Sequence, residues 1–174
     1  MTLCIEPATL AELPAIRAAY DHGRAMQRAR RSVVWPPFPD AAIVLEIDAG
    51  TLFSVCDATT MAGVFSMIDE DALIWGVDER GEHLYLHRIA RAATCARRGL
   101  VDDILRWAHQ RCVAHGRVGL RMDTWAGNHA LIAYYAARGF RLVDERRLSA
   151  DARLAAHYHG IDLALLEAPC DRMF

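Results

Sequence analysis

Gly99 is the residue whose position most directly suggests a binding chemistry. It comes after a strand-like run at residues 83 to 91 and opens an amphipathic helical pattern. Backbone N–H groups without helical partners and the positive end of the helix dipole meet at such a helix N-terminus, so a pyrophosphate would be stabilised there. Arg97 and Arg98 directly precede the glycine and could add positive charge. This order of residues predicts a phosphate-binding loop.

Cysteines and histidines are spaced poorly for a metal. The sequence has no C-x-x-C pair, so we expect neither a structural zinc site nor a disulfide framework, and we predict reduced thiols. His157 and His159 have the spacing of one strand face, but a metal site needs a third ligand that the sequence does not place. We therefore expect no metal. The five cysteines are Cys4, Cys56, Cys95, Cys112 and Cys170.

The elements that would position these residues follow from hydrophobic periodicity, caps and glycines. A capping box at Thr9–Glu12 precedes a helix whose first turn contains Pro14, where proline fits best. The expected strands cover residues 2 to 6, 51 to 57, 61 to 68, 83 to 91, 118 to 125, 140 to 147 and 158 to 167. The other expected helices cover residues 40 to 49, residues 100 to 115 and residues 129 to 138. This order predicts an α+β fold with a mixed sheet.

Composition limits the classes of function. The chain has 174 residues with no linker or repeat, so we expect one domain over residues 1 to 174. A formal net charge of -2 offers no global basic field, which argues against a nucleic-acid partner. The N-terminus does not resemble a signal peptide, and no apolar run approaches the roughly 20 residues that cross a bilayer. We expect no membrane partner and a cytoplasmic protein.

Two stretches carry a family resemblance. The first is Leu84–Arg91, followed by a loop and Gly99 at the start of a helix. The second is Asn128-x-x-Ala-x-x-x-Tyr135-x-x-x-Gly139-Phe140. Together they resemble the GNAT superfamily of acyl-CoA N-acyltransferases, and the element order of the whole chain is similar too. The resemblance implies a mixed, mostly antiparallel sheet flanked by helices, with two splayed central strands.

The resemblance also assigns a cofactor site for acetyl-CoA. The free backbone groups of Ile89, Ala90 and Arg91 would pair with the pantetheine arm, and the phosphates would lie at the loop before the helix. The family pattern there is Gln/Arg-x-x-Gly-x-Gly/Ala, whereas this chain has Ala96 and Val101 in place of the polar and the small residue. The cofactor-binding residues that we expect are Ile89, Ala90, Arg91, Arg97, Arg98, Gly99, Leu100, Val101 and Asn128.

Catalytic roles follow from the same resemblance. Tyr135 matches the family tyrosine that faces the CoA sulfur, where a phenol can donate a proton to the departing thiolate. His87 matches the position of a strand histidine, and an ordinary histidine pKa near 6.5 suits proton removal from the amine. Asp123, on the next strand, is the alternative base. Trp35 and Phe38 follow the first helix, where the family walls the acceptor pocket, or they anchor the core.

The expected function is therefore transfer of an acetyl group from acetyl-CoA to the primary amine of a small molecule. The altered loop keeps open a non-catalytic acyl-CoA-binding domain, and a protein acceptor is a third reading. The arginines between residues 24 and 31 and the acidic residues between 69 and 79 give opposite indications of the acceptor's charge. Family members often dimerise, so a homodimer is also open.

Overall fold

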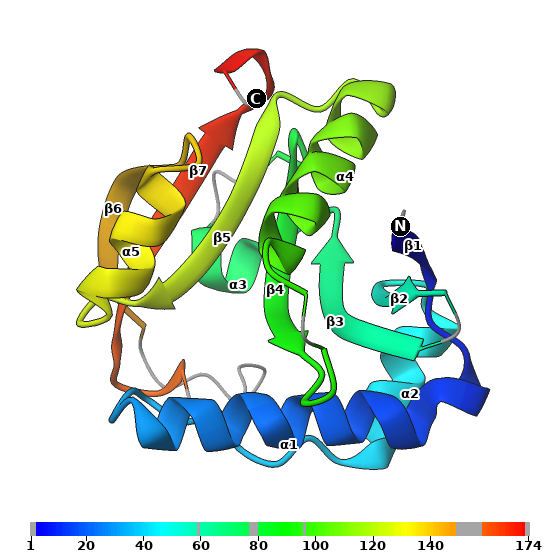
Figure 1. Ribbon diagram of the computed structural model, residues 1–174. Helices are drawn as coiled ribbons and strands as arrows, with labels where there is room; N and C mark the ends of the chain where they lie inside the picture. The colour runs from blue at the N-terminus through cyan, green and yellow to red at the C-terminus, as the bar shows by residue number, and fades with distance from the viewer. Residues whose placement is uncertain (1–2, 59, 77–79, 96, 149–157, 173–174) are drawn as a thin grey trace. The chain divides into compact units, whose positions relative to one another are not determined.

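The computed structural model in Figure 1 describes residues 3–58, 60–76, 80–95, 97–148 and 158–172. Contacts divide the chain into two compact units. The first unit comprises Met1–Met67 with His87–Trp107, and the second comprises Ile68–Leu86 with Ala108–Phe174. The expectation of one domain over residues 1 to 174 stays a prediction.

Seven strands form a mixed, mostly antiparallel sheet, so the predicted fold class is confirmed. Strand β4, His83–Arg91, contributes residues to both units. The strand order is β1-β2-β3-β4 in the first unit and β4-β5-β7-β6 in the second. The parallel ladder between β4 and β5 pairs His83–Leu86 with Gly119–Met122. Splaying of these two strands beyond that ladder would depend on how the units are placed, and it stays a prediction.

The first unit begins with the elements that the sequence predicted. The backbone N–H of Thr9 donates to the carboxylate of Glu12 at 2.7 Å, which confirms the capping box. Pro14 lies in the first turn of the following helix, and Ile16 and Tyr20 are buried. The elements are β1 (Leu3–Pro7), a 3-10 turn η1 (Leu10–Glu12), α1 (Leu13–Ala29), α2 (Asp40–Asp48), β2 (Leu52–Asp57) and β3 (Thr60–Ile68).

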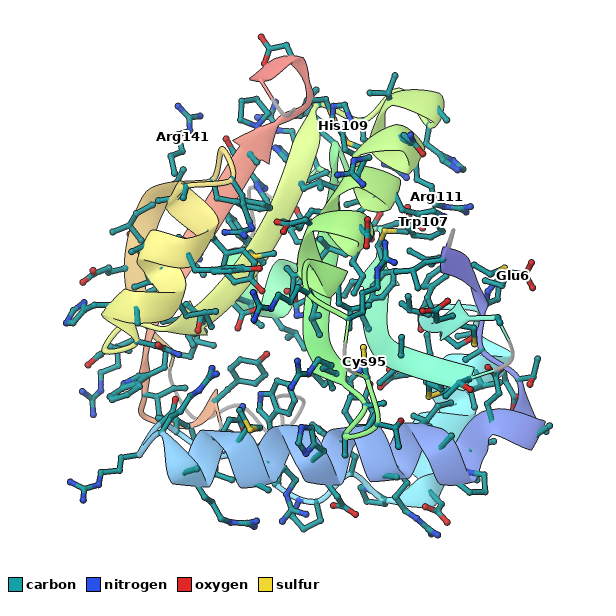
Figure 2. All side chains as sticks on the ribbon, in the orientation of Figure 1. Glu6, Cys95, Trp107, His109, Arg111 and Arg141 are labelled. Carbon is teal, nitrogen blue, oxygen red and sulfur yellow. A yellow bond between two sulfur atoms is a disulfide. The ribbon has the colours of Figure 1, made fainter. Side chains whose placement is uncertain are left out.

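The start of helix α4, Leu100–Ala114, is held against β3 by two kinds of packing. A Cβ on Gly63 would lie 2.8 Å from the carbonyl oxygen of Ala90 and 2.9 Å from the side chain of Leu100, so only glycine allows this approach. Trp107, labelled in Figure 2, packs with Phe53 and Phe65 at ring-centroid distances of 5.0 and 5.7 Å. These contacts fix the beginning of α4 in the first unit.

The second unit departs from the sequence-based expectations at two places. The last strand begins at Asp162 rather than residue 158, so His159 lies in a turn and not on a strand; His157 lies outside the described residues. A short helix within the acidic stretch was not predicted. The elements are α3 (Ala72–Trp75), β5 (Gly119–Trp125), α5 (His129–Ala136), β6 (Arg141–Arg147), β7 (Asp162–Pro169) and the 3-10 turn η3 (Cys170–Arg172).

The expectation that all thiols are reduced is wrong for one pair. Cys112 at the end of α4 and Cys170 in η3 form a disulfide across 58 residues of sequence. The spacing of the cysteines in the sequence does not indicate this pairing. His109, labelled in Figure 2, also contacts this turn, with Nε2 2.8 Å from the carbonyl oxygen of Cys170. Cys4, Cys56 and Cys95 are free.

The helices were compared with the length and apolar character of a membrane-spanning helix. Within the described residues, none of them combines the length and apolar character that a bilayer crossing requires.

Candidate active site

The loop after β4 begins a helix at the predicted place. Gly99 has a φ of 81°, a conformation that an L side chain rarely adopts, and its carbonyl accepts the N–H of Asp103 at 3.0 Å. Leu100 is buried beneath it. The first N–H groups of α4 have no partner within the helix, so the turn after Gly99 presents donors and a dipole suited to an anion.

The turn after Gly99 is less positively charged than the sequence suggested, because acidic side chains lie in it and bind nearby arginines. Arg97 binds Asp103 in the first turn, with Nε 3.0 Å from Oδ2, and Arg106 binds the other oxygen of Asp103 at 3.0 Å. Asp102 adds a second carboxylate in the same turn. These acids stabilise the helix N-terminus themselves and oppose a bound anion. Arg98 is exposed beside them, and Ala96 lies outside the described residues.

The end of β4 carries the predicted pantetheine-binding residues in the same unit as this loop. Ala90 is buried, His87 and Ile89 are half-buried, and Arg91 is exposed. Between them Arg88 has a φ of 50°, which is unusual for a residue other than glycine and locally breaks the strand geometry. Such breaks in strands often redirect backbone groups and side chains near binding sites.

Trp35 and Phe38 belong to an aromatic cluster of the first unit. Their rings lie 6.3 and 4.8 Å from the ring of Tyr20, and all three pack against the core that contains Ile43. Trp35 is further held by its backbone N–H, which donates to Oε1 of Gln27 at 2.9 Å. Both residues therefore anchor the core of the first unit, and their lining of an acceptor site stays a prediction.

Arg88 completes this cluster and was missed by the sequence reasoning. Its guanidinium lies 5.1 Å from the Phe38 ring centre and 5.8 Å from that of Tyr20, and it pairs with Glu46. Burial raises the pKa of Tyr20 to about 12, Arg88 opposes the shift and Glu46 adds to it. The sequence shows Arg88 only as an arginine beside His87 in an expected strand. The alternation of polar and apolar residues along a strand does not predict a positive φ.

Tyr135 lies in the second unit, on α5. The side chain is 8% exposed, and its ring packs at 5.7 Å against Phe140 and at 5.5 Å against Tyr134. Burial raises the pKa of Tyr135 above its ordinary value of 10.0; Tyr134 adds to the shift and Arg138 opposes it. The phenol therefore keeps its proton throughout the neutral range and is a weaker acid than an exposed tyrosine.

Asn128 begins α5 as its N-cap. Its side-chain oxygen accepts the N–H of Leu131 at 3.3 Å, which explains structurally why asparagine opens this helix. The predicted cofactor contact of Asn128 stays a prediction. Asp123, the alternative base, lies half-buried on β5.

A partly buried ionic network joins strands of the second unit. Glu167 on β7, with a side chain 12% exposed, accepts bonds from Arg121 at 3.0 Å and from Arg141 at 2.8 Å. His83 lies 3.3 Å from the same carboxylate. Burial alone would raise the pKa of Glu167, but the hydrogen bonds from Arg141 and Arg121 and the charges of Arg121 and His83 lower it below 4.5. Figure 2 shows Arg141 at the outer strand β6.

Arg121 links this network to aromatic side chains. It donates to the hydroxyl of Tyr85 at 3.1 Å, and its guanidinium lies 4.3 Å from the ring centre of Trp75. Tyr85 has no exposed surface and packs with Trp75 at 5.8 Å. The sequence reasoning missed this set, because no local pattern joins residues on α3, β4, β5 and β7.

The predicted site residues therefore form two groups. The first unit brings together His87, the end of β4, the loop at Gly99 and the Trp35–Phe38 pair. The second unit holds Tyr135, Asn128 and Asp123.

No protein-family model matches the chain. A curated relative, the uncharacterized N-acetyltransferase YesJ of Bacillus subtilis (strain 168), is 28% identical over 101 residues. That match covers 56% of this chain and 56% of YesJ, so it spans little more than half the length of that relative.

Solved structures match over nearly the whole chain. A GNAT-family acetyltransferase of Listeria monocytogenes has a TM-score of 0.72 and 16% identity over 96% of this chain and 94% of that one. The ribosomal-protein-S18-alanine N-acetyltransferase of Escherichia coli has a TM-score of 0.65 and 18% identity over 97% and 94%. The yncA protein of Salmonella typhimurium, solved with its cofactor acetyl-CoA, has a TM-score of 0.68 and 14% identity over 100% and 97%. The chain has the fold of the GNAT acyl-CoA N-acyltransferases.

Proposed function

We propose that this chain is an acetyl-CoA-dependent N-acetyltransferase that acts on the primary amine of a small molecule. The observation that carries the proposal is the helix start at Gly99. It follows β4 in a fold shared with yncA, which was solved with acetyl-CoA. The name of YesJ supports N-acetyl transfer as the reaction.

The residues at this helix start would bind the phosphates of an acyl-CoA by backbone groups rather than by side chains. Gly99 has a positive φ and, as a glycine, no Cβ over the turn, and Arg98 is exposed next to it. Arg97 and Arg106 offset the charge of Asp103. We infer that affinity depends on the N–H groups of residues 99 to 101 and the helix dipole, and that Asp102 weakens it.

Each proposed catalytic residue has one proton to move. Acetyl-CoA would supply the acyl thioester, which the acceptor amine would attack directly. Tyr135 would donate its phenolic proton to the departing sulfur. His87 would accept the proton that the amine loses, with Asp123 as the alternative base. Ile89, Ala90 and Arg91 would align the pantetheine arm through their backbone groups.

A specific observation supports a second candidate, a non-catalytic acyl-CoA-binding domain. Two carboxylates in the first turn of α4 are unfavourable for a tight phosphate site. The protein-acceptor reading draws on the Escherichia coli neighbour, whose name states a ribosomal protein as its substrate. We favour the enzyme over the binding domain, because Tyr135 and His87 are both present at the positions that the family resemblance assigns to catalysis.

Acetyl-CoA binding is the first test of the proposal. A ligand that binds only the folded state adds about 2.7 kcal/mol at a hundredfold excess over its Kd. Acetyl-CoA at about this excess should therefore raise the Tm by several degrees in a thermal melt. Acetate and adenosine at the same concentrations serve as controls and should produce no shift. An unchanged Tm with acetyl-CoA up to millimolar levels would contradict both the enzyme and the non-catalytic binding domain.

A further inference from the structure

Cys4 and Cys56 face each other across two neighbouring strands of the first unit. They are directly paired in the antiparallel register of β1 and β2, so their side chains lie on the same face. Neither belongs to the Cys112–Cys170 disulfide, and both are free. Cys4 is exposed and Cys56 is half-buried, so small reagents in solvent can reach the pair.

The two thiols line one hollow of about 240 Å³, together with Glu6 and Glu12. The Sγ of Cys4 lies 3.3 Å from Oε1 of Glu6. That hydrogen bond raises the pKa of Cys4, and burial followed by the charge of Glu12 raises that of Cys56. Both residues are therefore mainly thiols at neutral pH, so their oxidation proceeds through a minor thiolate fraction and should be faster at higher pH.

The ladder geometry brings the two Cα atoms within the range of a disulfide. The N–H of Ala8 donates to the carbonyl of Leu52, and alternation along the strands makes the Cys4–Cys56 pair a hydrogen-bonded one as well. Such pairs have Cα atoms about 5.5 Å apart, inside the range of about 4.4 to 6.8 Å that disulfides span. Their Cβ atoms must still approach by roughly 1 Å.

Two features allow that approach. β1 is an edge strand of the sheet, so only β2 restrains it in the ladder. On the other side of β2, the register with β3 shifts between Val55 and Cys56, and such irregularities locally bend and twist a strand. A bond formed with residual strain is also more easily reduced, which favours a reversible link.

We propose that Cys4 and Cys56 are a reversible dithiol–disulfide modification site that responds to peroxides. The sulfur of Cys4 attacks one oxygen of hydrogen peroxide, the O–O bond breaks, and a sulfenic acid and one water form. The sulfur of Cys56 then attacks the sulfenic sulfur, its proton leaves with the hydroxyl as a second water, and the S–S bond forms. Two thiols are oxidised and one peroxide is reduced to two waters. A dithiol reductant reverses the link.

Peptide mapping tests this site without reference to acetyl transfer. All 20 basic residues of the chain other than histidine are arginines, so trypsin places Cys4 in residues 1 to 17 and Cys56 in residues 32 to 80. The folded protein is treated with hydrogen peroxide, remaining thiols are alkylated, and the peptides are analysed without reduction. We expect the linked 1–17/32–80 pair in most molecules, and we expect dithiothreitol to remove it.

Two cysteine variants and a control for folding show whether the link is specific to Cys4 and Cys56. Cys95→Ser removes the remaining free thiol, seen in Figure 2 on the loop after β4, and should leave the link unchanged. Cys56→Ser should abolish the link and leave Cys4 as an adduct or an oxidised acid. Circular dichroism reports whether the fold persists in each sample, because a disulfide such as Cys112–Cys170 stays linked even in an unfolded chain. The proposal is overturned if the fold persists while Cys4 and Cys56 are recovered separately, or if Cys4 links to Cys95 instead.

Discussion

Tyr135→Phe is expected to lower the turnover of acetyl transfer by at least about tenfold while leaving the acetyl-CoA Kd nearly unchanged. The substitution keeps the ring that packs against Phe140 and removes only the phenol that would protonate the departing sulfur. General acid catalysis typically contributes about 10²- to 10⁴-fold. Steady-state kinetics should therefore show a loss in kcat, and calorimetry should show unchanged binding.

Tyr134→Phe is the matched control for this experiment. Tyr134 is the preceding residue, but its ring is stacked by the guanidinium of Arg138 at 3.4 Å and its position has no counterpart in the family pattern. We expect less than a twofold change in kcat for Tyr134→Phe. Equal rates for Tyr135→Phe and the wild type would mean that Tyr135 only packs, and the proposed acid would be wrong.

Glu167→Gln is expected to lower the free energy of unfolding by about 3 kcal/mol at pH 7, because it leaves a partly buried cation without its counter-charge. The side chain of Glu167 is 12% exposed and that of Arg121 is 19% exposed, so solvent cannot fully replace the lost carboxylate. Glutamine keeps the shape of the side chain, and the change therefore isolates the charge. Urea unfolding, followed by circular dichroism, measures the loss.

The pH dependence of this loss has a fixed sign. The folded-state pKa of Glu167 lies below 4.5, so its ion pairs stabilise the protein above that pH and the contribution disappears as the pH falls through the lowered pKa. The deficit of Glu167→Gln should be largest near neutral pH and should shrink in acid. Asp162→Asn on the same strand is the control, since its pair with Arg147 is exposed and should cost less than about 0.5 kcal/mol. Equal losses for the two variants would contradict the structural role of Glu167.

Local signals in the sequence predicted most of the fold. The capping box at Thr9–Glu12, the proline in the first turn of α1 and the helix start after Gly99 depend on neighbours within a few residues, and all three are confirmed. The late start of β7 and the short helix α3 were missed, because tertiary packing decides such boundaries. Pairing of Cys112 with Cys170 depends on the same long-range packing, which spacing does not encode.

The candidate site was predictable only where a motif marks it. Gly99 and Tyr135 belong to spaced patterns. The glycine has a positive φ and the tyrosine is buried, and their roles in binding and catalysis stay predictions. Arg88 and Glu46 meet across 42 residues, so no pattern could pair them. The sequence shows Asp102 and Asp103 in the first turn of α4. How strongly they repel a phosphate depends on the ion pair between Arg97 and Asp103, which only the structure reveals.

Release of free CoA from acetyl-CoA in the presence of amines tests the central claim most directly. The purified chain is incubated with acetyl-CoA and a panel of small primary amines, with N-terminal peptides as a separate panel, and free thiol is measured over time. The account predicts thiol release that requires both the chain and at least one small amine, accompanied by an equal amount of N-acetylated product. Binding of acetyl-CoA without release for any small amine, or release only with peptides, would contradict it.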